Sequence, residues 1–222
     1  METKEEQYKM LFEVEKKHGR SIFGIMANES WNCDPRRTLF TLSRYKFVSK
    51  MIAGSKEVLE IGCADAFGTR LVQQSVKNVT AIDFDPLFIE DVKSRDNKNW
   101  PLNTFVHNIL DGPVPGLYDS IYSLDVLEHI NKKDEDIFLK NLVSSLSKEG
   151  VAIIGMPSLE SQVWASPQSK AGHVNCKSGD DLKETLSKFF KNVFIFSMND
   201  EVIHTGYFPM AHYILALCCS KK

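Results

Sequence analysis

The strongest constraint on the fold is an alternation of short apolar runs with helical stretches, which begins at Glu57 and continues almost to the end of the chain. The apolar runs are 58–62, 79–83, 104–107, 120–125, 151–156, 193–198 and 213–219. The helical stretches between them are 69–76, 86–95, 134–147 and 178–190. Strands that are apolar throughout are buried on both faces, and helices that connect parallel strands provide that cover. The pattern therefore predicts an α/β fold, a three-layer α/β/α sandwich around a seven-stranded, mostly parallel sheet.

The sequence near the end of the chain indicates that one strand does not run parallel to the others. Leu182, Leu186 and Phe189 have helical spacing in 178–190, and Ser178 with Asp181 forms a capping box that starts this helix. The segment 199–212 that joins the last two strands is too irregular for a crossover helix. We therefore expect the last strand to run antiparallel to its neighbours.

Residues 1–56 have a different pattern of apolar and polar residues from the rest of the chain. They have the pattern of amphipathic helices, interrupted at 28–35 by asparagines, an aspartate and a proline. No internal repeat divides the remainder. We expect a helical N-terminal extension or lid over 1–56 and one sheet domain over 57–222.

Composition excludes several classes of protein. The chain has 222 residues with a net charge of -2, which gives no general reason to bind nucleic acid or an anionic membrane. No apolar run approaches the ~18–20 residues that span a bilayer, and the charged first residues lack the apolar core of a secretion signal, so we expect a cytoplasmic protein. The 5 cysteines contain no CxxC pair, which predicts reduced thiols and no metal site.

The loop after the first strand is where a ligand is expected, because open α/β sheets bind ligands beyond the carboxyl ends of their strands. Its sequence, 58–70, contains Gly62 followed by small residues that let a ligand approach the backbone. A dinucleotide fingerprint needs GxGxxG, but Ala64 and Phe67 occupy the second and third glycine places. Glu60 also disfavours phosphates. A cationic ligand without phosphates fits this loop better.

Three motifs in order resemble one family. Residues 60–66 resemble motif I of the class I S-adenosylmethionine (SAM) dependent methyltransferases, and Asp83 matches the ribose-binding acid of that family. Residues 118–130 resemble motif IV of its small-molecule branch, which includes ubiquinone-biosynthesis and sugar methyltransferases. The resemblance covers about 57–219. It implies a Rossmann-like methyltransferase domain over 57–222, with S-adenosyl-L-methionine as cofactor and a small-molecule acceptor.

The resemblance also implies which residues bind the cofactor. Glu60 and Gly62 would face the charged methionyl portion, while the Asp83 carboxylate would accept both hydroxyls of the ribose. Phe84 would cover one adenine face, and Asn108 or Asp111 would accept the bond from adenine N6. The full expected set is Glu60, Gly62, Cys63, Ala64, Asp83, Phe84, Asn108, Ile109 and Leu124.

Motif I departs from the family at two of its three glycines. This chain has Ala64 and Ala66 at those places, and a left-handed conformation at either alanine would be strained. Either the loop uses ordinary dihedral angles, or cofactor affinity is lower than in the family.

Two histidines and an aspartate are the candidates for acid–base catalysis. Methyl transfer is an in-line displacement that depends mainly on positioning, and a hydroxyl acceptor also needs a base. His129 either accepts that proton or orients the helix after the strand, and Asp125 at the strand tip is a second candidate. His173 is a third, and Asn175, two residues on, would point with it toward an acceptor or into solvent.

A basic stretch, 36–50, has no acid between Asp34 and Glu57. As part of a lid, its arginines could bind a phosphate or carboxylate of the acceptor; otherwise they form the solvated face of a helix. The residues that would contact such an acceptor are Arg36, Arg37, Arg44 and Tyr45.

Our hypothesis is that the chain methylates an oxygen or nitrogen of a small polar metabolite, for which a sugar-linked or phosphorylated compound is one candidate. A protein or RNA methyltransferase is the first alternative, although the charge counts against RNA. A noncatalytic SAM-binding module is the second, because motif I is substituted. No sequence pattern sets an oligomeric state.

Overall fold

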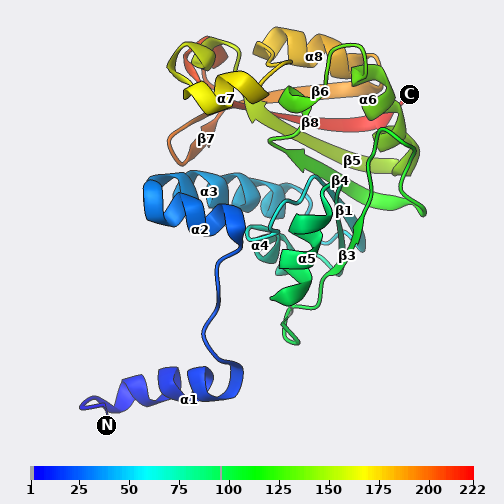
Figure 1. Ribbon diagram of the computed structural model, residues 1–222. Coiled ribbons are helices and arrows are strands. Elements are labelled where there is room, and N and C mark those ends of the chain that lie inside the picture. The colour runs from blue at the N-terminus through cyan, green and yellow to red at the C-terminus, as the bar shows by residue number, and fades with distance from the viewer. Residues whose placement is uncertain (1–2, 96) are drawn as a thin grey trace.

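The computed structural model describes residues 3–95 and 97–222 and has a single sheet of 8 strands at its centre (Figure 1). The sheet order is β3-β2-β1-β4-β5-β8-β6-β7. The strands are β1 (Glu57–Ile61), β2 (Asn78–Asp83), β3 (Asn103–Val106), β4 (Tyr118–Leu124), β5 (Leu146–Pro157), β6 (Phe190–Asn199), β7 (Val202–His204) and β8 (Tyr213–Lys221). Each of the seven predicted strands is present, so the α/β prediction is confirmed.

The strand directions agree with the prediction, but the number of strands does not. β1 pairs in parallel with β2 and β4, whereas β8 runs antiparallel to both β5 and β6. The eighth strand is β7, which pairs with Ser197–Asn199 of β6 in the segment that we expected to be a loop. Asp200 takes the left-handed conformation at the tip, with φ 49, and this tight turn lets the chain fold back into a short hairpin.

Helices cover both faces of the sheet. On one face, α6 (Glu135–Ser145) and α8 (Gly179–Ser187) bury Leu142 and Leu182. On the other face, α3 (Pro35–Met51) and α4 (Thr69–Gln73) bury Val48 and Val72. The capping predicted at Ser178 is confirmed, because its Oγ accepts a hydrogen bond from Asp181 N at 3.1 Å.

Shorter elements complete the chain. The helices α5 (Pro86–Ser94) and α7 (Pro167–Gly172) lie in the connections after β2 and β5. The 3₁₀ turns are Glu6–Tyr8, Leu127–His129, Glu160–Trp164 and Phe208–Met210. Among the described residues, no helix combines the length and the apolar character needed to cross a membrane.

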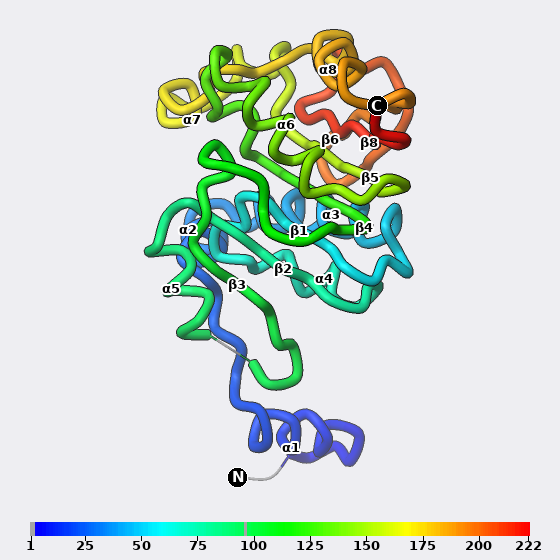
Figure 2. The backbone as a smooth tube through the Cα atoms, turned by 90° about the vertical axis from the view of Figure 1, so that its right-hand side faces the viewer, coloured from blue at the N-terminus to red at the C-terminus, as the bar shows by residue number. Residues whose placement is uncertain are grey.

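The N-terminal segment consists of two structurally different parts. Helix α1 (Lys9–His18) buries none of its residues and is joined to the other helices by an extended segment (Figures 1 and 2). Its last residue, His18, is hydrogen-bonded through Nδ1 to Asn99 Nδ2 at 2.9 Å. Helices α2 (Ile25–Cys33) and α3 pack against the sheet domain. The interruption expected over 28–35 was too long, because α2 continues to Cys33 and only Asp34 separates it from α3.

Candidate active site

The loop after β1 bends through three left-handed residues. Gly62, Ala64 and Ala66 have φ values of 78, 45 and 50. A Cβ on Gly62 would lie 2.3 Å from Val126 Cγ2, so this position requires glycine for space as well as for conformation. Of the two alternatives for the alanines, the structure therefore has the strained left-handed loop rather than ordinary dihedral angles.

Asp83 ends β2 directly beside this loop. Its Oδ2 accepts a hydrogen bond from Ala64 N at 2.9 Å, and its Oδ1 accepts one from Asp85 N at 2.9 Å. A carboxylate has about four lone-pair sites, so each oxygen retains capacity for a further donor. The Asp83 side chain thus both holds the loop in place and remains able to accept the two hydroxyls of a ribose.

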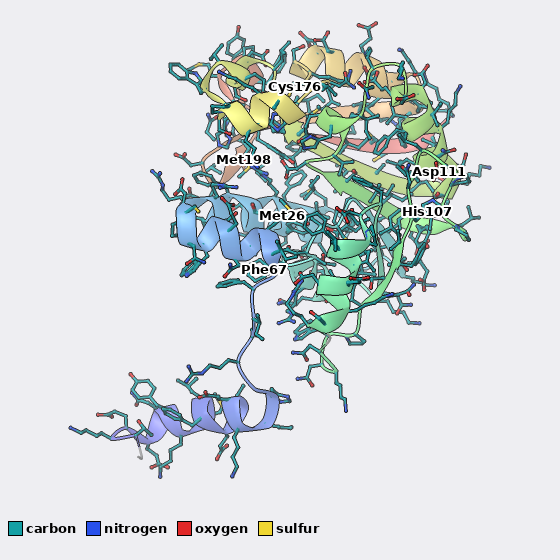
Figure 3. All side chains as sticks on the ribbon, viewed as in Figure 1. Met26, Phe67, His107, Asp111, Cys176 and Met198 are labelled. Carbon is teal, nitrogen blue, oxygen red and sulfur yellow. The ribbon has the colours of Figure 1, made fainter. Side chains whose placement is uncertain are left out.

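Phe84 and Asn108 lie at the ends of the neighbouring strands. Phe84 is 71% exposed and has an open ring face. The Asn108 Oδ1 accepts a hydrogen bond from Leu110 N at 3.1 Å, while Asp111 is exposed at the same loop (Figure 3). Behind them, the side chains of Cys63, Ile109 and Leu124 are buried. Together these residues fit a nucleoside. Asp83 supplies a bidentate hydrogen-bond acceptor, Phe84 supplies an open aromatic face, and a ligand can approach the backbone of the loop after β1.

Glu60 is positioned differently from our expectation. Its side chain is buried beneath the loop, where the hydroxyls of Tyr45, Thr69 and Tyr122 donate hydrogen bonds to it. Burial raises the pKa of Glu60 to about 7, although the three hydroxyls act in the opposite direction. The carboxylate supports the loop from below and does not face the place of the methionyl group.

Asp65 joins the loop to the N-terminal helices, a connection that the sequence did not reveal. Its Oδ2 accepts a hydrogen bond from Ala27 N at 2.7 Å, which caps α2 from outside the helix. A Cβ on Gly24 would lie 2.4 Å from the Asp65 Cβ. Phe23 then packs against Phe67, with ring centroids 5.1 Å apart. Helix α2 therefore begins on the loop after β1.

Arg44 is neutralised by Asp125 and does not face an anionic acceptor. Its Nη1 donates to both carboxylate oxygens, at 2.9 and 2.7 Å, and its guanidinium lies 3.8 Å from the centroid of the Tyr213 ring. Asp125 has φ 56, so the ion pair holds an uncommon backbone conformation at the end of β4. Asp125 is thus a structural partner of Arg44 rather than a free base.

The rest of the expected acceptor site is not brought together. Arg36 pairs with Asp34 and Arg37 pairs with Glu29, both at the protein surface. The Tyr45 hydroxyl is committed to Glu60. The prediction that these residues form one anion-binding site was wrong, because α3 turns Arg44 and Tyr45 inward and leaves the first two arginines with local acidic partners.

Asn175 also differs from its prediction. It is buried, its Nδ2 donates to Glu135 Oε2 at 2.8 Å, and Lys177 pairs with the same carboxylate oxygen at 2.6 Å. His173 and Asn175 therefore do not point toward a common acceptor, because the chain bends between them instead of staying extended.

The fold places His129 and His173, both candidates for proton transfer, next to each other. Their ring centroids are 5.1 Å apart, and His129 follows Glu128 in the 3₁₀ turn after β4. Partial burial, and secondly the nearby His129, lower the pKa of His173, which favours a neutral imidazole able to accept a proton. Glu128 was not among the predicted site residues, although its place beside His129 beyond a strand end indicates the same edge of the sheet. Burial, and then Asp125, raise the pKa of Glu128 well above its usual range.

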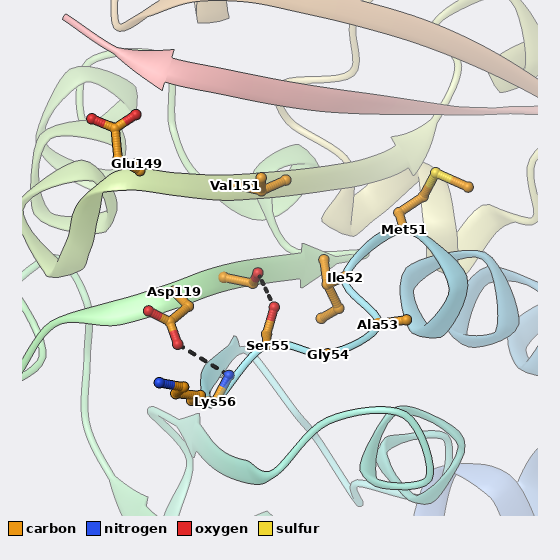
Figure 4. A pocket seen from close by; sticks show the side chains of 10 residues that line it. Met51, Ile52, Ala53, Gly54, Ser55, Lys56, Asp119, Glu149 and Val151 are labelled. Atoms are coloured by element: carbon orange, nitrogen blue, oxygen red, sulfur yellow. Dashed lines mark hydrogen bonds between the residues drawn. The ribbon is translucent and has the colours of Figure 1, made fainter.

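A cavity of about 490 Å³ lies at the opposite edge of the sheet, at the amino ends of β1 and β4 (Figure 4). Lys56 N donates to Asp119 Oδ2 there at 3.0 Å, and the hydroxyls of Ser55 and Ser120 are 2.8 Å apart. These groups are paired with one another, and ligands of parallel sheets bind at the other edge. The candidate site is therefore the carboxyl edge.

Comparison with known proteins agrees with this location. The profile of a family described as "Methyltransferase domain" matches residues 59–154, which run from β1 to β5 and contain the loop, Asp83 and His129. Residues 59–154 are therefore similar to SAM-dependent methyltransferase domains. S-adenosyl-L-methionine is the cofactor of such domains.

Relatives and solved structures are distant in sequence. The mitochondrial ubiquinone biosynthesis O-methyltransferase of Schizosaccharomyces pombe is 24% identical over 144 residues, which are 60% of this chain and 52% of the relative. The chain spans about half or less of the length of the curated relatives it matches.

Two solved structures share the fold of the methyltransferase domain. N-methyltransferase NodS of Bradyrhizobium japonicum, in complex with S-adenosyl-L-homocysteine, has a TM-score of 0.61 at 21% identity, with 86% of this chain and 91% of that chain covered. A SAM-dependent methyltransferase of Clostridium acetobutylicum has a TM-score of 0.69 at 11% identity, with 87% and 97% covered.

Proposed function

We propose that this chain transfers a methyl group from SAM to an oxygen or nitrogen of a small polar molecule. The observation that carries the proposal is the junction of Asp83 with the left-handed loop after β1, beside the edge where His129 and His173 meet. The names of the S. pombe relative, an O-methyltransferase, and of NodS, an N-methyltransferase, support both types of acceptor atom.

Some residues at the carboxyl edge of the sheet would bind the cofactor, and others would act on the acceptor. When bound, SAM supplies an electrophilic methyl group on a sulfonium. Asp83 would accept hydrogen bonds from the ribose, Phe84 would cover the adenine, and Asn108 would accept from its amino group. His129 and His173 lie beyond β4, where they would take up the proton that a hydroxyl acceptor loses.

The charge of the chain supports a small-molecule acceptor rather than RNA. The net charge is -2, and the arginines at the start of α3 are paired with acids instead of forming an open basic surface. Within this proposal, α2 and α3 of the N-terminal segment 1–56 cover the methyltransferase domain of 57–222, with α2 capped by Asp65 of the loop.

Calorimetric titration with SAM tests the cofactor half of the proposal. We expect binding to one site, weakened at least ~10-fold in Asp83→Asn, because the carboxylate charge is lost while an amide oxygen still accepts from Ala64 N. Asp136→Ala, an exposed acid on α6, is the matched control. A folded wild-type chain that releases no heat with SAM refutes the proposal.

A screen for release of S-adenosylhomocysteine with candidate acceptors tests the catalytic half. His129→Ala should lose turnover with a hydroxyl acceptor while it still binds SAM. Turnover with a protein or RNA acceptor and none with small molecules would support the alternative acceptor class. SAM binding with no turnover on any acceptor would support a noncatalytic module.

A further inference from the structure

Glu128, His129 and His173 form a cluster of metal-ligand groups at the carboxyl edge of the sheet. One ligand atom from each residue lies within 4.8 Å of the other two. Glu128 and His129 come from the 3₁₀ turn after β4, and His173 directly follows α7. Two separate segments of the chain thus present two imidazoles and one carboxylate to a common point.

Hydrogen bonds at Nδ1 fix the tautomer of both imidazoles. His129 Nδ1 lies 2.9 Å from the Gly172 carbonyl oxygen, and His173 Nδ1 lies 2.8 Å from Gln162 Oε1. Both partners are acceptors, so in each ring Nδ1 carries the proton and Nε2 keeps its lone pair. Metal-binding histidines are held in this way, by a hydrogen bond from the other ring nitrogen to a carbonyl or carboxylate.

Glu128 supplies an independent observation. Its side chain is 1% exposed, and neither carboxylate oxygen has a hydrogen-bond partner among the described residues. The guanidinium of Arg44 is bound to Asp125 instead. A buried polar group without a partner is costly, and a carboxylate in that position is satisfied by a cation.

Backbone contacts hold the carboxylate beside the histidines. The Glu128 carbonyl oxygen accepts hydrogen bonds from Val174 N at 2.8 Å and from Asn175 N at 3.0 Å. These bonds tie the turn after β4 to the segment that carries His173. The cluster is therefore built into the fold rather than formed by freely rotating surface side chains.

We propose that Glu128, His129 and His173 bind one divalent transition-metal cation. Ligand atoms around a zinc-like ion stand about 3.0–3.4 Å apart, so small side-chain rotations close the present spacing. Two imidazoles and a carboxylate suit Zn²⁺, Fe²⁺ or Co²⁺ better than Mg²⁺ or Ca²⁺. This inference replaces the sequence-based expectation of no metal, which rested on the cysteine spacing and on the lack of a recognisable Asp-Asp-Asn magnesium set.

Three protein ligands leave coordination positions open for an acceptor oxygen. This second part rests on the proposed function. With the metal bound, the cation takes over the role proposed above for the imidazoles: it would lower the pKa of an acceptor hydroxyl, so that its proton leaves to solvent instead of to His129 or His173. The oxygen then forms a bond to the methyl carbon as the carbon–sulfur bond breaks, and the electron pair of that bond stays on sulfur.

Titration of the full chain with Co²⁺ after EDTA treatment and dialysis tests the site, with visible absorption and calorimetry as readouts. We expect one bound ion per chain. His173→Ala should weaken binding by more than ~100-fold, and Gln162→Ala, which removes the hydrogen bond that orients His173, by about 10–100-fold. His204→Ala is the control, because the His204 Nε2 pairs with Asn199 outside the cluster.

Two outcomes overturn the metal site: no Co²⁺ binding by the folded chain, or binding that His173→Ala and His204→Ala change equally. His129→Gln provides a second ligand variant if His173→Ala does not fold. SAM titration of the EDTA-treated protein separates the two proposals, because cofactor binding with no Co²⁺ binding refutes only the metal site.

Discussion

Ala64 carries backbone strain that a single substitution should relieve. Its φ of 45 lies in the left-handed region, which costs an L-residue with a Cβ roughly 1–2 kcal/mol. Glycine removes that cost but gives the unfolded chain more freedom, worth about 0.4–1 kcal/mol. The methyl group of Ala64 belongs to none of the apolar clusters of the described residues. Ala64→Gly should therefore stabilise the fold by about 0.5–1 kcal/mol.

Thermal unfolding and urea titration measure this effect. For a chain of this size the melting temperature should rise by about 1–4 °C. Ala66→Gly should change stability by close to zero, because its methyl packs with the cluster of Cys63, Ala81 and Ile89 and its loss offsets the relieved strain. Ala53→Gly is the control, an exposed turn residue outside the positive-φ set of the described chain, and should destabilise. If Ala64→Gly destabilises as Ala53→Gly does, the reasoning is refuted.

Two further substitutions test the contacts that surround the loop. The pKa of Glu60 rises from 4.5 in the unfolded chain to about 7 in the folded one. The stability that protonated Glu60 contributes is therefore fully present below about pH 4.5 and is lost as the pH rises through about 7. The total loss in the free energy of unfolding is about 3 kcal/mol. Glu60→Gln should remove this dependence in urea titrations at about pH 5 and about pH 8, and parallel wild-type and variant profiles would contradict the assignment. Asp65→Ala should destabilise by about 1 kcal/mol and speed amide exchange in the first turn of α2, because Ala27 N loses its acceptor. Asp65→Asn, which keeps an oxygen acceptor, should change both much less, and equal effects would show that the cap is unimportant.

The strands and most of the helices could be predicted from sequence because their signal is local. Runs such as 151–156 are apolar throughout, and β5 contains that run between the helices α6 and α7. The short strand β7 escaped prediction because Val202–His204 has no such pattern and forms only through pairing with β6. Pairing of this kind depends on the tight turn at Asp200, which the sequence does not mark with glycine.

More of the cofactor side of the site than of the acceptor side could be predicted from the sequence. Gly62, Ala64 and Asp83 follow strand ends, so the topology alone places them at one edge. The acceptor side depends on which way individual side chains point. Arg44 and Tyr45 were expected to contact an anionic acceptor, yet both face acids inside the fold. The approach of His173 to His129 follows from the bend after α7, which has no local sequence signal.

The contacts of α2 and α3 also limit which part of the N-terminal segment can act as a lid. Asp65 holds α2 to the loop after β1, and Tyr45 of α3 donates to Glu60 beneath it. Val48 of α3 is fully buried in the core. Moving α3 would expose that core and break the hydrogen bond to Glu60, at a cost of several kcal/mol. Opening of the whole segment 1–56 is therefore unfavourable. Helix α1 buries no residue, and its hydrogen bond between His18 and Asn99 is exposed, so displacing this helix would not uncover the core.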